Sequence, residues 1–167
     1  CPDLNVCKAN GDCEPMPGDL TGPVVDEVIQ GNCDTTDEQI FVEKMTEGFV
    51  EIVEVTTQIH LVLDPSQKMG TMELKLSHNG VVVTLVEPDP TNTDTELHAT
   101  FDIGKLPIEG SMKDFEGQLL QGKWVLSIED TTGGEACYTL ESWDIFTTTK
   151  PIAACSSDAD CDNGQAC

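Results

Sequence analysis

The chain has 167 residues, close to the usual size of one domain with short appendages. It carries 31 acidic residues against eight lysines and no arginine, and its formal net charge of -23 should repel nucleic acid and anionic membrane surfaces. No run of about 18 apolar residues is present, so the sequence predicts no membrane insertion.

The eight cysteines indicate an exported protein with disulfides. Three lie near each end, with five residues between neighbours: Cys1, Cys7 and Cys13, then Cys155, Cys161 and Cys167. Zinc is the competing interpretation, but CxxC pairs and Cys/His clusters are both missing from the sequence. We therefore expect a secreted or cell-surface location.

Both ends resemble partial copies of the short Cys-rich repeats of secreted myxobacterial proteins, which usually have a fourth cysteine. We expect a piece of a longer bacterial polypeptide, with its leader removed or upstream. Either the two ends share a bridge, or one thiol in each end is free. The chain then divides into a partial repeat with a linker (residues 1–20), a central domain (21–150) and a second partial repeat (151–167).

The central domain shows dense strand signals bounded by Gly, Pro, Asp or Asn. A weak alternation comes first, at Val24–Gln30. The predicted strands are Gln39–Lys44, Phe49–Val55, Gln58–Leu63, Thr71–Ser77 and Val81–Val86, with short extended pieces at Thr100–Ile103 and Leu106–Ile108. His78, Asn79 and Gly80 indicate a hairpin turn, and Glu87–Glu96 a loop. No capped helical stripe is present, so we expect little helix.

The stretch Phe115–Phe146 holds both tryptophans. Residues around Trp124, and again around Trp143, alternate as in strands with one buried face. Asp130 and the glycines that follow it favour a tight turn, so we predict a hairpin with internal tryptophans at the centre of a sheet. About eight or nine strands without helix-strand alternation predict an all-β, two-layer antiparallel sandwich.

Cys33 and Cys137 are the two cysteines of the central domain. We predict that they bridge each other and close a loop of about a hundred residues. In the chain-entropy model such a bridge contributes roughly 4 to 5 kcal/mol, less any strain. The alternative is a pair of free buried thiols.

The Phe115–Phe146 stretch resembles the P domain, or homo B domain, of kexin- and furin-like proprotein convertases and secreted bacterial proteases. Three submotifs occur in the family's order: Phe115-Glu116-Gly117, then GKWVLSIED from Gly122 to Asp130, then LESWDIF from Leu140 to Phe146. Looser matches at Leu74–Leu85 and Ala99–Asp102 extend the resemblance to about residues 24–149. The family's His-Pro and Gly-Asp-Leu elements are altered here, as is its last turn at Cys137.

This resemblance implies a jelly-roll sandwich of the galactose-binding-domain-like type, without catalytic residues. The residues themselves agree, because no G-x-S-x-G or other nucleophile motif is present. His60 lies in an apolar strand and is expected to be packed or at a rim, whereas His78 is expected to be exposed in its turn. We therefore predict that the chain is not an enzyme.

Calcium is the cofactor that the acidic loops favour, because carboxylate and amide oxygens are its preferred ligands. The candidate ligands are Asp89, Asn92, Asp94, Glu96, Asp102 and Asp130. None of their spacings forms a complete calcium motif. For each residue taken alone, a solvated or turn-capping carboxylate is the more common role.

The sequence thus predicts a non-catalytic accessory module of a secreted bacterial protein. The resemblance implies that such a module supports the folding and stability of a subtilisin-like protease, with neighbouring domains, among them a protease catalytic domain, as partners. The alternative is an adhesive or carbohydrate-binding module of a multi-domain surface protein, with a glycan as its partner. Sugar sites usually display aromatic platforms, and the tryptophans here are predicted to be internal.

Overall fold

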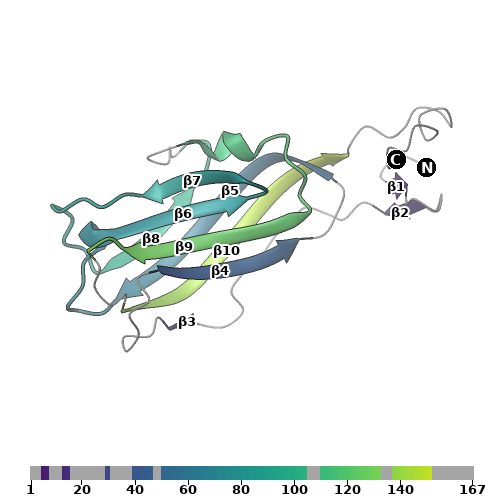
Figure 1. The fold of residues 1–167 in the computed structure, drawn as a ribbon. Helices are drawn as coiled ribbons and strands as arrows, with labels where there is room; N and C mark the ends of the chain where they lie inside the picture. Colours follow the sequence, from purple (N-terminus) through teal and green to yellow (C-terminus); the bar gives the residue numbers. More distant parts are fainter. Residues whose placement is uncertain are drawn as a thin grey trace.

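The computed structural model describes residues 50–104, 110–132 and 137–150 in full. It describes the backbone alone of short strands at 5–7, 13–15, 29–30 and 39–46 and of residue 151. Two antiparallel sheets form separate layers of a sandwich (Figure 1). The predicted all-β sandwich is therefore confirmed.

Each sheet has four strands, and we name the sheets after one central strand each. The β5 sheet has the order β3 (Ile29–Gln30), β10 (Tyr138–Pro151), β5 (Val50–Leu63) and β8 (Glu96–Phe101). The β9 sheet has the order β4 (Gln39–Thr46), β9 (Gly122–Asp130), β6 (Met72–His78) and β7 (Val81–Val86). A separate pair joins β1 (Asn5–Cys7) to β2 (Cys13–Pro15).

The sandwich was expected to have eight or nine strands, and fewer lie in the fully described part of the chain. From residue 50 onwards the sheets contain six strands, three in each layer. The backbones of β3 and β4 add one further strand to each layer. The predicted boundaries of the Cys-rich ends stay predictions, because most of those residues lie outside the described ranges.

The core lies between the two sheets and consists of alternate residues of the facing strands. On β9 these include Trp124, Leu126 and Ile128, all fully buried. On β10 they include Trp143 and Ile145, also fully buried. The period of two therefore identified the inward residues of β9 and of β10 from Trp143 onwards, and the prediction of internal tryptophans is confirmed. Leu140, predicted on the opposite face, is also fully buried, because a register shift separates it from Ser142.

The predicted hairpin between the two tryptophan strands is wrong. β9 belongs to one sheet and β10 to the other, and Figure 1 shows them in separate layers. Residues 131–137 connect them, which is enough chain to cross the roughly 10 Å between packed sheets. Alternation shows that a strand buries one face, but the same signal arises whether that face belongs to the upper or the lower layer.

The two strands predicted at Phe49–Val55 and Gln58–Leu63 are one continuous strand, β5, of 14 residues. Thr57, which looked like part of a break, is fully buried in its middle. Its hydroxyl accepts a hydrogen bond from the indole N–H of Trp143 at 3.0 Å and donates one to the carbonyl of Asp144 at 3.0 Å. A buried hydroxyl with both partners costs little, so the strand continues through it.

The β6–β7 hairpin is confirmed, with Asn79 and Gly80 at positive φ in its turn. His78, however, is not exposed as predicted: it is the last residue of β6 and is only 1% exposed. Its position was readable from the sequence, because it continues the inward series of Met72, Leu74 and Leu76.

The chain between β7 and β9 also differs from expectation. β8 begins at Glu96, earlier than the predicted extended piece at Thr100–Ile103. The predicted piece at Leu106–Ile108 lies outside the described residues, as does most of the Val24–Gln30 segment. The described ranges contain no α-helix and two short 3-10 helices, η1 (Met69–Thr71) and η2 (Met112–Phe115).

Candidate functional site

Three connections meet at one end of the sandwich, and we call this set of residues the loop end. It comprises residues 64–71 between β5 and β6, residues 87–95 between β7 and β8, Asp130 at the end of β9, and residues 131–132 and 137 between β9 and β10. Five of the six predicted calcium ligands lie here or directly beside it. Asp102 does not, because it follows the opposite end of β8.

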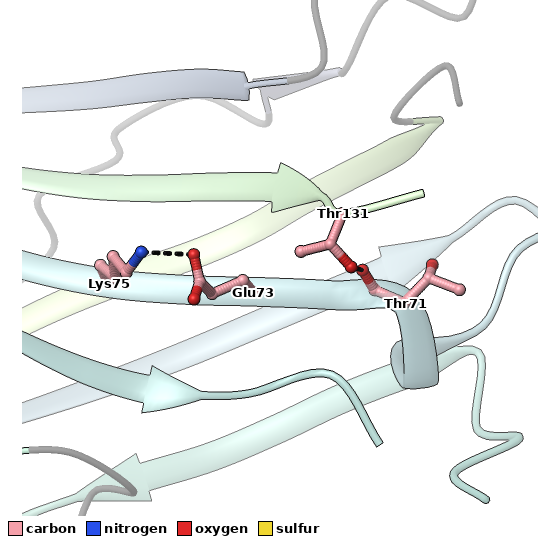
Figure 2. A network of polar contacts seen from close by, with 4 residues as sticks. All are labelled: Thr71, Glu73, Lys75 and Thr131. Atoms are coloured by element: carbon pink, nitrogen blue, oxygen red, sulfur yellow. Dashed lines mark hydrogen bonds and ion pairs between the residues drawn. The ribbon is translucent and has the colours of Figure 1, made fainter. Parts of the chain in front are cut away.

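Backbone hydrogen bonds tie these connections to η1. The N–H of Met69 donates to the carbonyl of Asp94 at 2.7 Å, and the N–H of Thr131 donates to the carbonyl of Thr71 at 3.0 Å. Figure 2 shows Thr131 and Thr71 meeting at this point, with the Thr131 hydroxyl also donating to the Thr71 carbonyl at 2.9 Å. Three segments that are distant in sequence are thereby held as one surface.

Gly70 lets two of these segments approach closely. A Cβ on this residue would lie 2.5 Å from the backbone oxygens of both Asp89 and Asn92. Backbone atoms cannot move aside cheaply, so glycine is required here for packing. The β7–β8 connection is therefore fitted directly against η1.

The predicted ligand side chains of the loop end cap their own turns. Asp89 accepts hydrogen bonds from the backbone N–H and the hydroxyl of Thr91 at 2.9 and 2.7 Å. Asn92 accepts one from the N–H of Asp94 at 2.9 Å. Asp130, which is 5% exposed, accepts bonds from the N–H and hydroxyl of Thr132 at 3.0 and 2.8 Å. These are Asx-turn interactions.

Asp64, which was not among the predicted ligands, caps a turn of the loop end in the same way. Its carboxylate accepts bonds from the N–H and hydroxyl of Ser66 at 2.9 and 2.7 Å. These bonds lower the pKa of Asp64, as those from Thr91 lower the pKa of Asp89. The shared pattern of an Asp two places before Ser or Thr was the available sequence signal.

Among the described residues, no three His, Cys, Asp or Glu side chains form a group that could hold a metal ion. Glu96 pairs with His60 at 2.9 Å, and Asp102 accepts a bond from the N–H of Gly104 at 2.6 Å. The six predicted ligands are thus distributed over separate local contacts. Calcium binding stays a prediction from the sequence.

The outer face of the β9 sheet beside the loop end carries a small polar network (Figure 2). Glu73 and Lys75, two residues apart on β6, form an ion pair. They point to the same side of the strand, as the period of two requires. Such a partly exposed pair contributes at most about 1 kcal/mol, so the network is a surface feature and no site for chemistry.

The described histidines are not paired with nucleophiles. His60 contacts Glu96 and stacks on His98 with ring centroids 4.8 Å apart, on the outer face of the β5 sheet. His60 was expected to be packed or at a rim, and it packs here against a second histidine ring. His78 faces the carbonyls of Leu119 and Lys123 and stacks on Trp124 at 4.0 Å.

The described aromatic side chains do not form an exposed platform. Trp124, Trp143 and Phe115 are fully buried, and Tyr138 is 3% exposed. Burial without a hydrogen-bond partner raises the pKa of the Tyr138 hydroxyl. The carbohydrate-binding alternative stays a prediction, and a glycan array would test it.

Cys137 is disulfide-bonded. Its N–H donates to the side-chain oxygen of Gln67 at 2.9 Å, and its carbonyl accepts from the N–H of Asp64 at 2.9 Å. The predicted partner, Cys33, lies outside the described residues, so the pairing stays a prediction.

The residues of the Phe115–Phe146 motif have clear structural roles. Phe115 packs against Trp124 with ring centroids 5.1 Å apart. Gly117 has a φ of 82°, and its N–H donates to the carbonyl of Ile52 at 2.9 Å. Gly122 has a φ of 148° and leaves room for the side chain of Asn79. The motif therefore closes one end of the sandwich.

Comparison with known proteins assigns this fold to a family. The family model described as the proprotein convertase P-domain matches residues 50–147, more than half of the chain. No curated protein matches. A solved structure of a serine protease (ASP) from Aeromonas sobria in complex with the chaperone (ORF2) is similar, with a TM-score of 0.53 and 11% identity.

That similarity covers 89% of this chain and 36% of the Aeromonas chain, so this chain spans about a third of that protein's length. At 11% identity the likeness supports the fold alone. The family model matches residues 50–147, a range that includes the Phe115–Phe146 motif. The chain belongs to the proprotein convertase P-domain family.

Proposed function

We propose that this chain is a non-catalytic accessory domain of a secreted bacterial protein that supports the folding and stability of a subtilisin-like protease. The observation that carries the proposal is the P-domain match over residues 50–147, which spans the sandwich from β5 to β10. P domains form a non-catalytic family associated with secreted proteases. No described helix is long and apolar enough to span a membrane.

The described side chains are consistent with an accessory role. The histidines contact carboxylates, carbonyls or each other, and the motif residues are used for packing. The solved structure with a similar fold is a serine protease in complex with a chaperone. A domain of this kind would act through its surface, by contact with the protease part of the same polypeptide.

The test is to express the complete reading frame in three forms: unchanged, with residues 50–151 deleted, and with Trp143→Ala. Trp143 is fully buried, so this substitution unfolds or strongly destabilises the domain without touching its surface, at a cost of roughly 3 to 5 kcal/mol. The expected result is loss of soluble, active protease in both altered forms.

The control is a surface substitution on the same domain, Glu54→Gln, which should leave protease yield unchanged. A reading frame without a protease domain, or a deletion that leaves protease yield and thermal stability intact, would overturn the proposal. Active-site titration separates the yield of folded enzyme from its turnover rate.

A further inference from the structure

The open edge of the β5 sheet is the strongest unassigned feature of the described residues. β8 is the last strand of this sheet, and it pairs on one side with β5. The register pairs His60 with His98 and Leu61 with Leu97, without a shift. One long edge of β8 therefore faces away from the sheet.

The hydrogen-bond pattern identifies which backbone groups lie on that edge. The N–H of Leu63 donates to the carbonyl of Thr95 at 2.8 Å, and bonded pairs in an antiparallel ladder recur at every second residue. The bonded residues of β8 are therefore Leu97, Ala99 and Phe101. The N–H and carbonyl groups of Glu96, His98 and Thr100 point away from β5, toward the open edge.

The stacked rings of His60 and His98 agree with this assignment, because side chains approach most closely at non-hydrogen-bonded pairs. In the described part of the chain, the backbones of Glu96, His98 and Thr100 have no partner on the outer side. The backbone groups of three alternate residues are thus available to pair with an added strand.

β8 also lacks the usual protections of an edge strand. Its six residues, ELHATF, contain no lysine or proline, and its pairing has no bulge. The edge strand of the other sheet, β7, differs: its pairing with β6 has a register shift, and Gly110 lies against Val83 and the carbonyl of Val82. Of these two edge strands, β8 is the one whose pairing is unshifted.

The surroundings of the edge indicate the chemistry of a partner. The described strands of the β5 sheet carry five carboxylates, namely Glu51, Glu54, Glu96, Glu141 and Asp144, and one lysine, Lys150. That lysine pairs with Glu51 at 2.7 Å. On the inward side, Leu97 is partly exposed while it packs on the core. On its outward face an added strand would meet Glu96 of β8, and on its inward face the partly exposed Leu97. The formal net charge of -23 over the whole chain adds to the preference for a basic partner.

We propose that β8 binds an extended segment of a partner protein by strand addition, and that this segment alternates basic and apolar residues. Backbone pairing at Glu96, His98 and Thr100 supplies affinity, and the alternating side chains supply specificity. A second copy of this chain is disfavoured as the occupant, because each copy has a formal charge of -23.

The experiment uses a fluorescein-labelled heptapeptide in which lysine and valine alternate. Its control has the same composition with all lysines placed before all valines, so that charge is equal and the alternation is lost. We expect the alternating peptide to bind at least tenfold more tightly by fluorescence anisotropy. Amide hydrogen exchange should slow at Glu96, His98 and Thr100 when it binds, with little change at Leu97 and Ala99, which are already bonded to β5.

Thr100→Pro removes an outward N–H, a change that edge strands tolerate, whereas Thr100→Ala keeps it. The proline variant should lose the preference for the alternating peptide, and the alanine variant should retain it. Exchange protection at Leu97 and Ala99 in the free proline variant reports that β8 is still paired.

The proposal is overturned by equal binding of the two peptides, by an unaltered preference in a folded Thr100→Pro variant, or by no binding at millimolar peptide. Slowed exchange at the three edge amides that rises with protein concentration, without peptide, would assign the edge to a second copy and overturn it as well.

Discussion

The side-chain amide of Asn79 occupies the space where a Cβ on Gly122 would lie. From there the Asn79 amide donates to the carbonyls of Leu119 and Gln121, both at 3.0 Å. The β6–β7 turn is thus hydrogen-bonded to the residues that directly precede β9. The glycine of the family motif is explained by a contact with a residue far away in sequence.

Gly122→Ala should lower the free energy of unfolding by roughly 2 to 3 kcal/mol, because the new methyl group displaces Asn79 and a φ of 148° strains any side chain. Gly80→Ala is the matched control: its φ is 86°, but no atom lies within 4 Å of the added Cβ. It should cost about 1 kcal/mol. Urea unfolding measures both, and equal losses would contradict the role of Asn79.

Thr57→Val should destabilise the domain by about 1 to 3 kcal/mol, because it leaves the buried indole N–H of Trp143 without its acceptor. In a Trp143→Phe background the same substitution should cost less, since that N–H is already gone. A double-mutant cycle measures the coupling between the two residues. Strict additivity would show that the hydrogen bond does not contribute.

Burial lowers the pKa of His78 below its ordinary value, against the opposing effect of the Leu119 and Lys123 carbonyls. Below the unfolded pKa of about 6.5, the unfolded chain therefore binds more protons than the native domain. The free energy of unfolding is highest above this pH and decreases as the pH falls below it. His78→Gln should remove this part of the pH dependence. Urea unfolding across this pH range measures the difference, and an unchanged pH dependence in His78→Gln would contradict the role of this residue.

Calcium binding to the native domain alone must raise the melting temperature. If the loop end binds calcium, millimolar calcium should raise the melting temperature relative to chelator, and Asp89→Asn should reduce that increase. Magnesium controls for charge screening. No change with calcium would leave Asp89 and Asn92 with the turn-capping role that their hydrogen bonds show.

The predicted Cys33–Cys137 bridge should appear as one cross-linked pair in non-reducing peptide mapping. Cys33→Ser should lower stability by roughly 4 to 5 kcal/mol, because the unfolded chain regains the entropy of a loop of about a hundred residues. Free thiols at both positions would contradict the pairing. If Cys137 were cross-linked to another cysteine, its disulfide would stand but the predicted pairing with Cys33 would be wrong.

The sequence predicted the strands and their inward faces well, because the buried positions around Trp124 and Trp143 repeat with a period of two. It did not predict the layer of each strand, since burial from above and below produces the same alternation. Thr57 and His78 were misassigned for a shared reason. Each is a polar residue whose partners, Trp143 and the Leu119 carbonyl, lie more than 40 residues away.

The candidate site was less predictable than the fold. The spacing of the acidic residues identified most of those that gather at the loop end. The same side-chain oxygens can bind a metal or cap a turn, however, and only their contacts with Thr91 and Thr132 show the turn-capping role. The open edge of β8 leaves no mark in the sequence, because an edge is a property of strand order.

β10 pairs with β5 along almost its entire length. β10 is the last strand of the sandwich and lies between β5 and β3. A chain that ends at Asp130 lacks one of the two central strands of the β5 sheet and one of the two buried tryptophans. The β5 sheet can therefore be completed only when the chain up to Pro151 is available.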